Sequence, residues 1–273
     1  MDFDYAVHSD FLIHWTGKDL DCAYDPNWRE NGQSKTEGEL TEKYLQRLRD
    51  TLRFGLWLTS ETAQQARIGS KVIRIPDTPK TCFTELKLSE SRKHARRYGR
   101  LGIGVKRKYV FDRCGRPVTY FNSLSRHDRF VESCVNKLED RALLNFLKPM
   151  HREAAGNVSP WNYDFYAESE WRIVYLPELL DGTRVVDPRD ESNAKANAFF
   201  RSLATTDQNR LQYLAPLDGW LAMVIYPSLS VKNEAQQNPK YEIQSEIQRI
   251  KDESKVEDGN WPIEVDLDAC RNF

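Results

Sequence analysis

The sequence predicts an α+β fold, in which a mixed, largely antiparallel sheet with flanking helices forms a single elaborated domain over residues 1–273. Three observations support this prediction. A chain of 273 residues is long for one domain and short for two. Hydrophobic residues make up 40% and aromatic residues 11%, enough apolar surface to offset chain entropy and exclude a largely disordered protein. Strand-like and helix-like segments alternate irregularly, without the repeating βαβ order of a doubly wound sheet.

The first predicted elements are a strand and a long helix. Residues 11–16 (FLIHWT) form a short apolar run that is typical of a buried strand. Thr36 stands at the capping-box position of a helix predicted over 37–54, in which leucines recur at helical spacing. Gly55 ends this helix.

The later elements are predicted from short apolar runs and from helical periodicity. Further strands are expected at 56–60, 81–86, 101–106, 108–111, 117–121, 170–176, 220–226 and 263–267. Further helices are expected at 89–98, at 128–147 and around Ile243, Ile247 and Ile250. The last of these elements form a C-terminal β-α-β extension over about 217–273.

Charge and hydropathy exclude several classes of protein. Lys and Arg total 40 against 41 for Asp and Glu, so the net charge of −1 excludes a uniformly basic nucleic-acid coat. The most apolar stretch, 220–226, is far shorter than the roughly 20 residues that cross a bilayer. The acidic N-terminus lacks the order of a secretory signal, so we expect a cytoplasmic protein with no membrane partner.

Metal sites and common catalytic motifs are not indicated. The five cysteines are scattered without a CxxC pair, and the five histidines form no HExxH, so we expect reduced thiols and no metal. The phosphate-loop patterns GxxxxGK[ST] and GxGxxG and the nucleophile elbow GxSxG are all missing.

His14 and Thr16 lie two residues apart on an apolar strand and therefore point to one side of it. A ligand that bears hydroxyl groups, such as the ribose of a nucleotide, would explain two polar groups on one strand face. A histidine hydrogen-bonded to a neighbouring carbonyl is the more common explanation.

Glu168, Glu170 and Arg172 alternate in the same way within ESEWR. A carboxylate fixed on a strand could stabilise an oxocarbenium-like transition state, while a second one orients an acceptor. The alternative is a local ion pair between Glu170 and Arg172, which is common and has no catalytic role.

The segment 87–108 carries nine basic residues and one acid, a local net charge of 9 − 1 = +8. Guanidinium groups bind phosphates bidentately, so this segment could hold a pyrophosphate or a nucleic-acid backbone. Alternatively it is a solvated helix face that docks on an acidic partner, such as the C-terminal stretch from Val231. The candidate phosphate-binding residues are Arg92, Lys93, Arg96, Arg97 and Arg100.

The order FLIHWT, GLWLTS, TCFTELKLSES, HARRYGRLGIGVKR, RPVTYF, FLKP and FYAESEWR resembles the AbiGi-type abortive-infection family of bacterial phage-resistance proteins. The resemblance covers about residues 11–176, the family-like core of the predicted domain. It implies a role in phage defence, with a cognate toxin or antitoxin partner.

The layout is also similar, more distantly, to ADP-ribosyltransferases, whose early strand carries His-x-Thr and whose late strand carries a catalytic Glu. This resemblance implies an ADP-ribosyltransferase-like fold with NAD as substrate. It also implies a catalytic Glu170 assisted by Glu168. The implied NAD-binding residues are His14 and Thr16 on the adenosine ribose side and Thr84 or Tyr98 near the nicotinamide.

Three functions follow as hypotheses. The first is a toxin that transfers ADP-ribose from NAD to a nucleic-acid or protein acceptor. The second is a non-catalytic antitoxin or sensor that binds and restrains a partner toxin, with His14 and Glu170 as structural residues. The third and weakest is a metal-independent nuclease that uses His14 or His94 as general acid or base.

Overall fold

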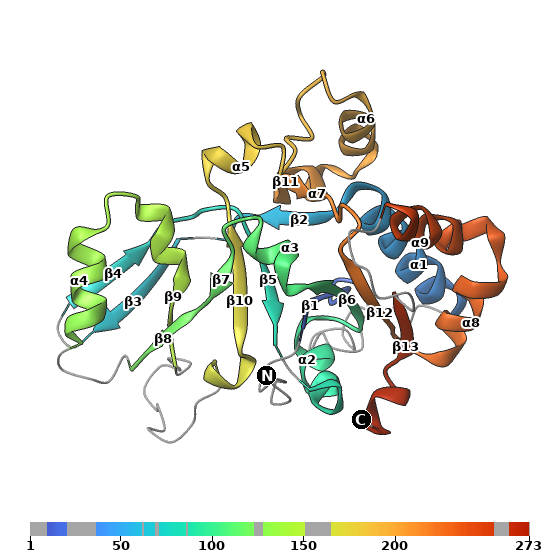
Figure 1. Cartoon of the computed structure of the whole chain (residues 1–273), viewed down its shortest axis with the longest axis horizontal. Coiled ribbons are helices and arrows are strands. Elements are labelled where there is room, and N and C mark those ends of the chain that lie inside the picture. The colour runs from blue at the N-terminus through green and yellow to red at the C-terminus, as the bar shows by residue number, and fades with distance from the viewer. Residues whose placement is uncertain are drawn as a thin grey trace, which may run out of the picture. The chain divides into compact units, whose positions relative to one another are not determined.

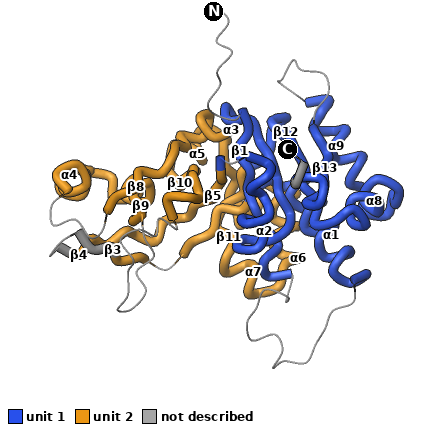
Figure 2. The backbone as a smooth tube through the Cα atoms, turned by 90° about the horizontal axis from the view of Figure 1, so that it is seen from below, with its two compact units in different colours: residues 1–56, 85–109, 216–273 blue, residues 57–84, 110–215 orange. Residues whose placement is uncertain are grey.

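The computed structural model divides the chain into two compact units, drawn in two colours in Figure 2. It describes residues 10–20, 37–61, 63–68, 71–85, 87–122, 128–150, 165–253 and 262–272. Unit 1 consists of Met1–Leu56, Glu85–Tyr109 and Pro216–Phe273. Unit 2 consists of Trp57–Thr84 and Val110–Ala215. The predicted α+β class and the mixed, mostly antiparallel sheet are confirmed, while the single-domain prediction stays a prediction.

Unit 1 has a sheet in which β1 pairs with β6, β6 with β12 and β12 with β13 (Figure 1). The first two pairings are antiparallel and the last is parallel. The strands are β1 (Phe11–Thr16), β6 (Leu101–Lys106), β12 (Leu221–Tyr226) and β13 (Ile263–Asp266). Gly102 lies opposite Trp15 in the register, and a Cβ at that glycine would come within 3.0 Å of the indole ring. The small residue therefore leaves room for Trp15 in the core.

The helices of unit 1 include the predicted long helix, which is confirmed at the predicted bounds as α1 (Glu37–Phe54). Its expected cap Thr36 lies outside the described residues. Between the parallel strands β12 and β13 the described part of the chain includes α8 (Leu229–Gln237), η5 (Pro239–Tyr241) and α9 (Ile243–Asp252), while the predicted C-terminal β-α-β extension stays a prediction. The other elements are α2 (Ser91–Tyr98), η2 (Leu88–Glu90) and η6 (Ala269–Asn272).

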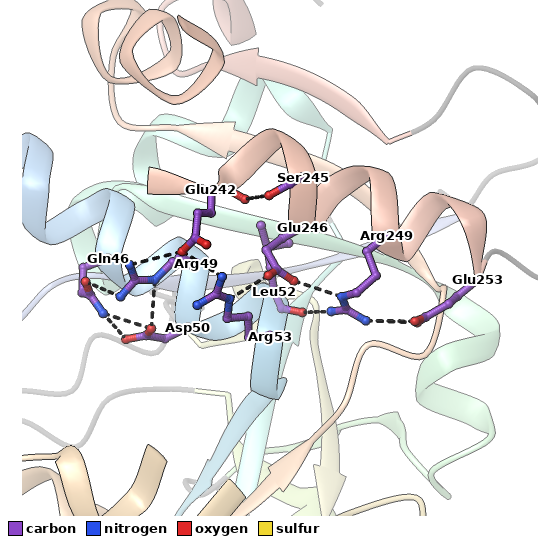
Figure 3. A network of polar contacts seen from close by, with 10 residues as sticks. All are labelled: Gln46, Arg49, Asp50, Leu52, Arg53, Glu242, Ser245, Glu246, Arg249 and Glu253. Carbon is purple, nitrogen blue, oxygen red and sulfur yellow. Dashed lines mark hydrogen bonds and ion pairs between the residues drawn. The ribbon is translucent and has the colours of Figure 1, made fainter. Parts of the chain in front are cut away.

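A network of ion pairs joins α1 to α9 (Figure 3). Arg53 on α1 contacts Glu246 at 2.7 Å and Glu242 at 2.8 Å. In the opposite direction, Arg249 on α9 donates a hydrogen bond of 2.9 Å to the main-chain oxygen of Leu52. Backbone carbonyls in the last turn of a helix lack intrahelical partners, so this bond satisfies one of them. The network fastens the C-terminal extension to the N-terminal helix.

Unit 2 has a central sheet with the strand order β11-β2-β5-β10-β7, with antiparallel pairing of β2 with β5, of β5 with β10 and of β10 with β7. Its strands are β2 (Leu56–Thr59), β5 (Lys80–Thr84), β7 (Arg116–Pro117), β10 (Glu170–Val174) and β11 (Leu211–Ala215). The first residue of β2 is the last residue of the first segment of unit 1. Two smaller strand pairs are the antiparallel hairpin β3 (Gln64–Ile68) and β4 (Lys71–Ile75), and the parallel pair β8 (Thr119–Phe121) and β9 (Leu147–Pro149).

The helices of unit 2 are short. A small hydrophobic core packs Ile73 and Ile75 of the hairpin against Val131 and Leu144. The helices are α4 (Arg129–Lys137), η3 (Arg141–Phe146), η4 (Tyr166–Glu168), α5 (Pro177–Asp181), α6 (Ala194–Ser202) and α7 (Thr205–Arg210). None of the helices in the described ranges combines the length and the apolarity needed to span a membrane.

Two predicted elements are corrected by the structure. The strand expected at 108–111 is the helix α3 (Arg107–Phe111), in which Tyr109 and Val110 are fully buried. The helix expected over 128–147 ends at Lys137, and the chain continues as η3 and β9. Asp140 accepts a hydrogen bond from the Ala142 amide and so starts η3 separately.

Candidate functional site

The main concentration of buried charge in the described residues lies on and around β10 in unit 2. All five residues of this strand are buried, with β5 on one side and β7 on the other. An ionised group in such a place is stable only when it is paired and hydrogen-bonded. We call the group formed by Lys148, Glu168, Glu170 and Arg172 the ionic cluster.

Glu170 and Arg172 form the centre of the ionic cluster. Because they alternate on one strand, their side chains share a face. Arg172 donates from Nε to Glu170 Oε1 at 2.6 Å and from Nη2 to Oε2 at 3.1 Å, a bidentate pair. Its Nη1 donates to the main-chain oxygen of Asn145 in η3. The local ion pair that the sequence allowed is therefore present.

Lys148 on β9 bridges two carboxylates. Its Nζ contacts Glu168 Oε2 at 2.7 Å and also contacts Glu170 Oε2. The expectation that Glu168 lies on the same strand is wrong, since Glu168 ends η4. Ser169, which follows it, has a left-handed φ of 43°. This turn brings the two glutamates to one ammonium group.

Hydrogen bonds extend the ionic cluster to neighbouring elements. The Tyr120 hydroxyl on β8 accepts a hydrogen bond of 2.8 Å from the Glu170 amide. Lys80 on β5 donates to Asn145 Oδ1 at 3.3 Å and pairs with the exposed Glu61 at 3.2 Å. Elements far apart in the sequence thus meet at β10.

The positive charges of the ionic cluster lower the pKa of Glu170. Burial raises the pKa of its carboxyl, but the positive charges of Arg172 and Lys148 outweigh burial and lower the pKa from 4.5 to about 2. The nearby Cys82 thiol has a pKa raised by burial and by the Glu170 charge. Because the thiolate is the reactive form, this raised pKa disfavours Cys82 as a nucleophile.

This geometry favours the structural interpretation of Glu170. Its side chain is 6% exposed, and both of its oxygens are engaged by cations. A carboxylate already neutralised in this way has little charge left to stabilise an oxocarbenium ion. The catalytic roles of Glu170 and Glu168 stay predictions.

The expected NAD-binding residues are distributed over both units. Thr84 in unit 2 lies opposite Glu170 in the β5–β10 register. In unit 1, Thr16 faces α1, where its Oγ1 accepts a hydrogen bond of 3.2 Å from Arg47. His14 lies on the same side of β1 as Thr16 and is half-buried. Tyr98 packs against the cluster that contains Trp15, on the opposite face of β1, and the next residue, Gly99, abuts the Thr16 main chain.

The basic segment lies in unit 1, on and around α2. Arg92 donates to the Leu267 carbonyl at 3.1 Å and pairs with Asp268. Arg100 donates to the Pro227 carbonyl at 2.8 Å. Two of the five candidate phosphate-binding residues therefore contact the C-terminal extension.

Sequence reasoning missed several residues of the site. Lys148, Tyr120 and Asn145 reach β10 from 20 or more positions away along the chain. Lys148 is flanked by Leu147 and Pro149, and a single lysine in an apolar context carries no local signal of its partners. In the described residues, no group of three or more His, Cys, Asp or Glu side chains could hold a metal ion.

A known protein family matches part of the chain. Neither the curated proteins nor the solved structures contain a match to the chain. A family model described as "Putative abortive phage resistance protein AbiGi, antitoxin" matches residues 59–199, just over half of the chain. The whole ionic cluster lies in the matched range. The chain therefore belongs to the AbiGi family of abortive-infection proteins, which act in phage defence.

Proposed function

We propose that the protein is the antitoxin of a phage-defence pair, which binds a partner toxin and restrains it. The observation that carries this proposal is the family model, whose description names an antitoxin and whose matched range, 59–199, includes most of unit 2. In this function the ionic cluster is a scaffold. It holds β5, β8, β9, β10 and η3 in one arrangement and takes no part in chemistry.

The surface of unit 2 suits a protein partner. Large apolar side chains stand in solvent on several of its elements, among them Phe130 on α4, Tyr166 on η4 and Phe111 on α3, with exposed fractions of 61%, 57% and 54%. All three are aromatic, and aromatic residues contribute strongly to protein interfaces. The toxin-binding surface is therefore expected on this unit.

Expression in a bacterial host tests the proposal. The protein alone should leave growth unchanged, and it should restore growth when it is produced together with a toxic product of a neighbouring gene. Growth arrest by the protein alone would overturn the proposal and favour the toxin hypothesis. Co-purification of the two proteins would then test whether restraint works by direct binding.

The variant Glu170→Gln distinguishes the antitoxin proposal from the hypothesis of an NAD-dependent transferase. In an ADP-ribosyltransferase, Glu170→Gln abolishes nicotinamide release from labelled NAD while the protein stays folded. In an antitoxin, the wild-type protein releases no nicotinamide, and Glu170→Gln lowers protection only as far as it lowers the amount of folded protein. Arg201→Gln, on an exposed ion pair of the same unit, is the matched control.

A further inference from the structure

One side of the helix α2 carries three cations, two of which are exposed. Lys93, Arg96 and Arg97 are spaced so that they share one side of the helix. The opposite side carries His94 and Ala95, which are buried. The exposed charges are therefore held on a short rigid element and not on a loop.

The cations of this segment divide into two groups. Arg92 and Arg100 hold α2 to the C-terminal extension through the contacts described above. Lys93 and Arg96 are exposed, and Arg97 is half-buried, with its guanidinium 5.4 Å from the centre of the Tyr98 ring. The only acid between residues 87 and 108 is Glu90, which pairs with Lys93 on the surface. Such an exposed pair is weak and can be exchanged for another anion.

The composition of this face indicates its ligand. None of the strongly exposed large hydrophobic residues in the described part of the chain lies between residues 85 and 109. Arg is common in protein interfaces, but such interfaces also need apolar or aromatic anchors, which this face lacks. Single-stranded nucleic acids are bound on exposed aromatic side chains, whereas Tyr98 is half-buried and packs against the core. A duplex requires only cations placed along its phosphates.

We propose that the α2 face, formed by Lys93, Arg96 and Arg97, binds the phosphate backbone of duplex DNA without reading its sequence. Arg96 and Arg97 can each contact a phosphate bidentately, while Lys93 contacts one as a point charge. Arg92 and Arg100 are positioning residues, because they hold the helix and do not touch the DNA. This activity does not depend on the antitoxin proposal.

Fluorescence anisotropy of the full chain with a labelled duplex of about 30 base pairs of mixed sequence tests the proposal. Each lost phosphate contact removes about 0.9 from the slope of log affinity against log salt. The triple variant Lys93→Gln/Arg96→Gln/Arg97→Gln should therefore lose about 2.7 of that slope. At low salt it should bind about tenfold more weakly or worse. Arg96→Lys keeps the charge and should keep the slope.

A matched control removes three exposed lysines elsewhere, as Lys43→Gln/Lys195→Gln/Lys251→Gln, and should change duplex binding less than twofold. Circular dichroism checks that both triple variants stay folded. Equal losses in the two triple variants would overturn the proposal, because binding would then follow net charge and not this face. It would also be overturned if the wild-type protein bound polyglutamate or single-stranded RNA in preference to the duplex.

Discussion

Replacing Arg172 by Met should strongly destabilise the protein. Arg172 forms the bidentate pair with Glu170 and also donates to the Asn145 carbonyl. Methionine has a similar length but no charge and no donors. The variant therefore leaves Glu170 buried with Lys148 as its remaining ionic partner, and it leaves one main-chain oxygen without a hydrogen bond from this side chain.

The size of the effect follows from the burial of the pair. Removing one partner of a buried ion pair typically costs about 3–5 kcal/mol, because the other charge stays buried. The low pKa of Glu170 reflects Arg172, Lys148 and Cys82 together, acting against burial, so it gives the order of magnitude and not the share of Arg172 alone. Its fall from 4.5 to about 2 in the folded state corresponds to about 3 kcal/mol, since one unit equals about 1.4 kcal/mol. We expect a loss of about 3 kcal/mol or more.

Urea denaturation followed by circular dichroism measures the free energy of unfolding. With a slope of about 1–3 kcal/mol/M, the midpoint should fall by about 1 M or more. The control is Arg201→Met, which breaks the surface pair of Arg201 with Glu191. Both of these side chains are mostly exposed, so the expected loss is about 1 kcal/mol at most.

The double variant Glu170→Gln/Arg172→Met tests the reason for the effect. If the cost of Arg172→Met comes from an unpaired carboxylate, removing that charge should recover part of the stability. Two results would refute the reasoning. One is a loss for Arg172→Met no larger than that for Arg201→Met, and the other is a double variant whose loss equals the sum of the single losses.

Three further predictions concern other groups. The pKa of Glu170 is about 2 in the folded protein and 4.5 in the unfolded chain, so its contribution to stability is complete above about pH 4.5 and is lost as the pH falls towards 2. Glu170→Gln should therefore make the stability depend less on pH in acid denaturation measurements across this range. Gly104→Ala should lower stability by about 1–3 kcal/mol, seen as a lower melting temperature, because the new Cβ would lie 2.7 Å from the Met223 Cβ; an unchanged melting temperature would contradict this packing. Burial raises the pKa of the Cys270 thiol to about 11, so this thiol should react slowly with iodoacetamide. After brief treatment, peptide mass spectrometry should find Cys270 unmodified and the exposed Cys114 alkylated. Equal labelling of the two cysteines would contradict the protection of Cys270 by burial.

Local sequence signals predict an element well when both its periodicity and its end are marked by particular residues. The helix α1 has both periodic leucines and a terminating Gly55, and it begins and ends at the predicted residues. The segment Arg107–Phe111 has the composition of a strand but forms a helix, because tertiary packing buries both Tyr109 and Val110. The end of α4 at Lys137 is not predictable from the sequence, because the apolar residues that follow keep the spacing of a helix.

The candidate site was predictable only along one strand. The pairing of Glu170 with Arg172 follows from their alternation, so the sequence contained it as one of two interpretations. Lys148 and Tyr120 lie 22 and 50 positions from Glu170, and their meeting depends on strand packing that no local pattern encodes. Glu168 reaches Lys148 through the backbone turn at Ser169, which is equally absent from the periodicity.

The path of the chain through its two units has a consequence for biosynthesis. Unit 2 is complete once the ribosome has added Ala215, whereas β6 gains its neighbour β12 only afterwards, and β13 later still. At about 5–20 residues per second, the interval from Ala215 to Asp266 lasts several seconds. During that time the growing polypeptide carries a β6 strand with one vacant edge. A truncated product that ends near Ala215 would retain that edge permanently, so it is expected to aggregate even though unit 2 is present in full.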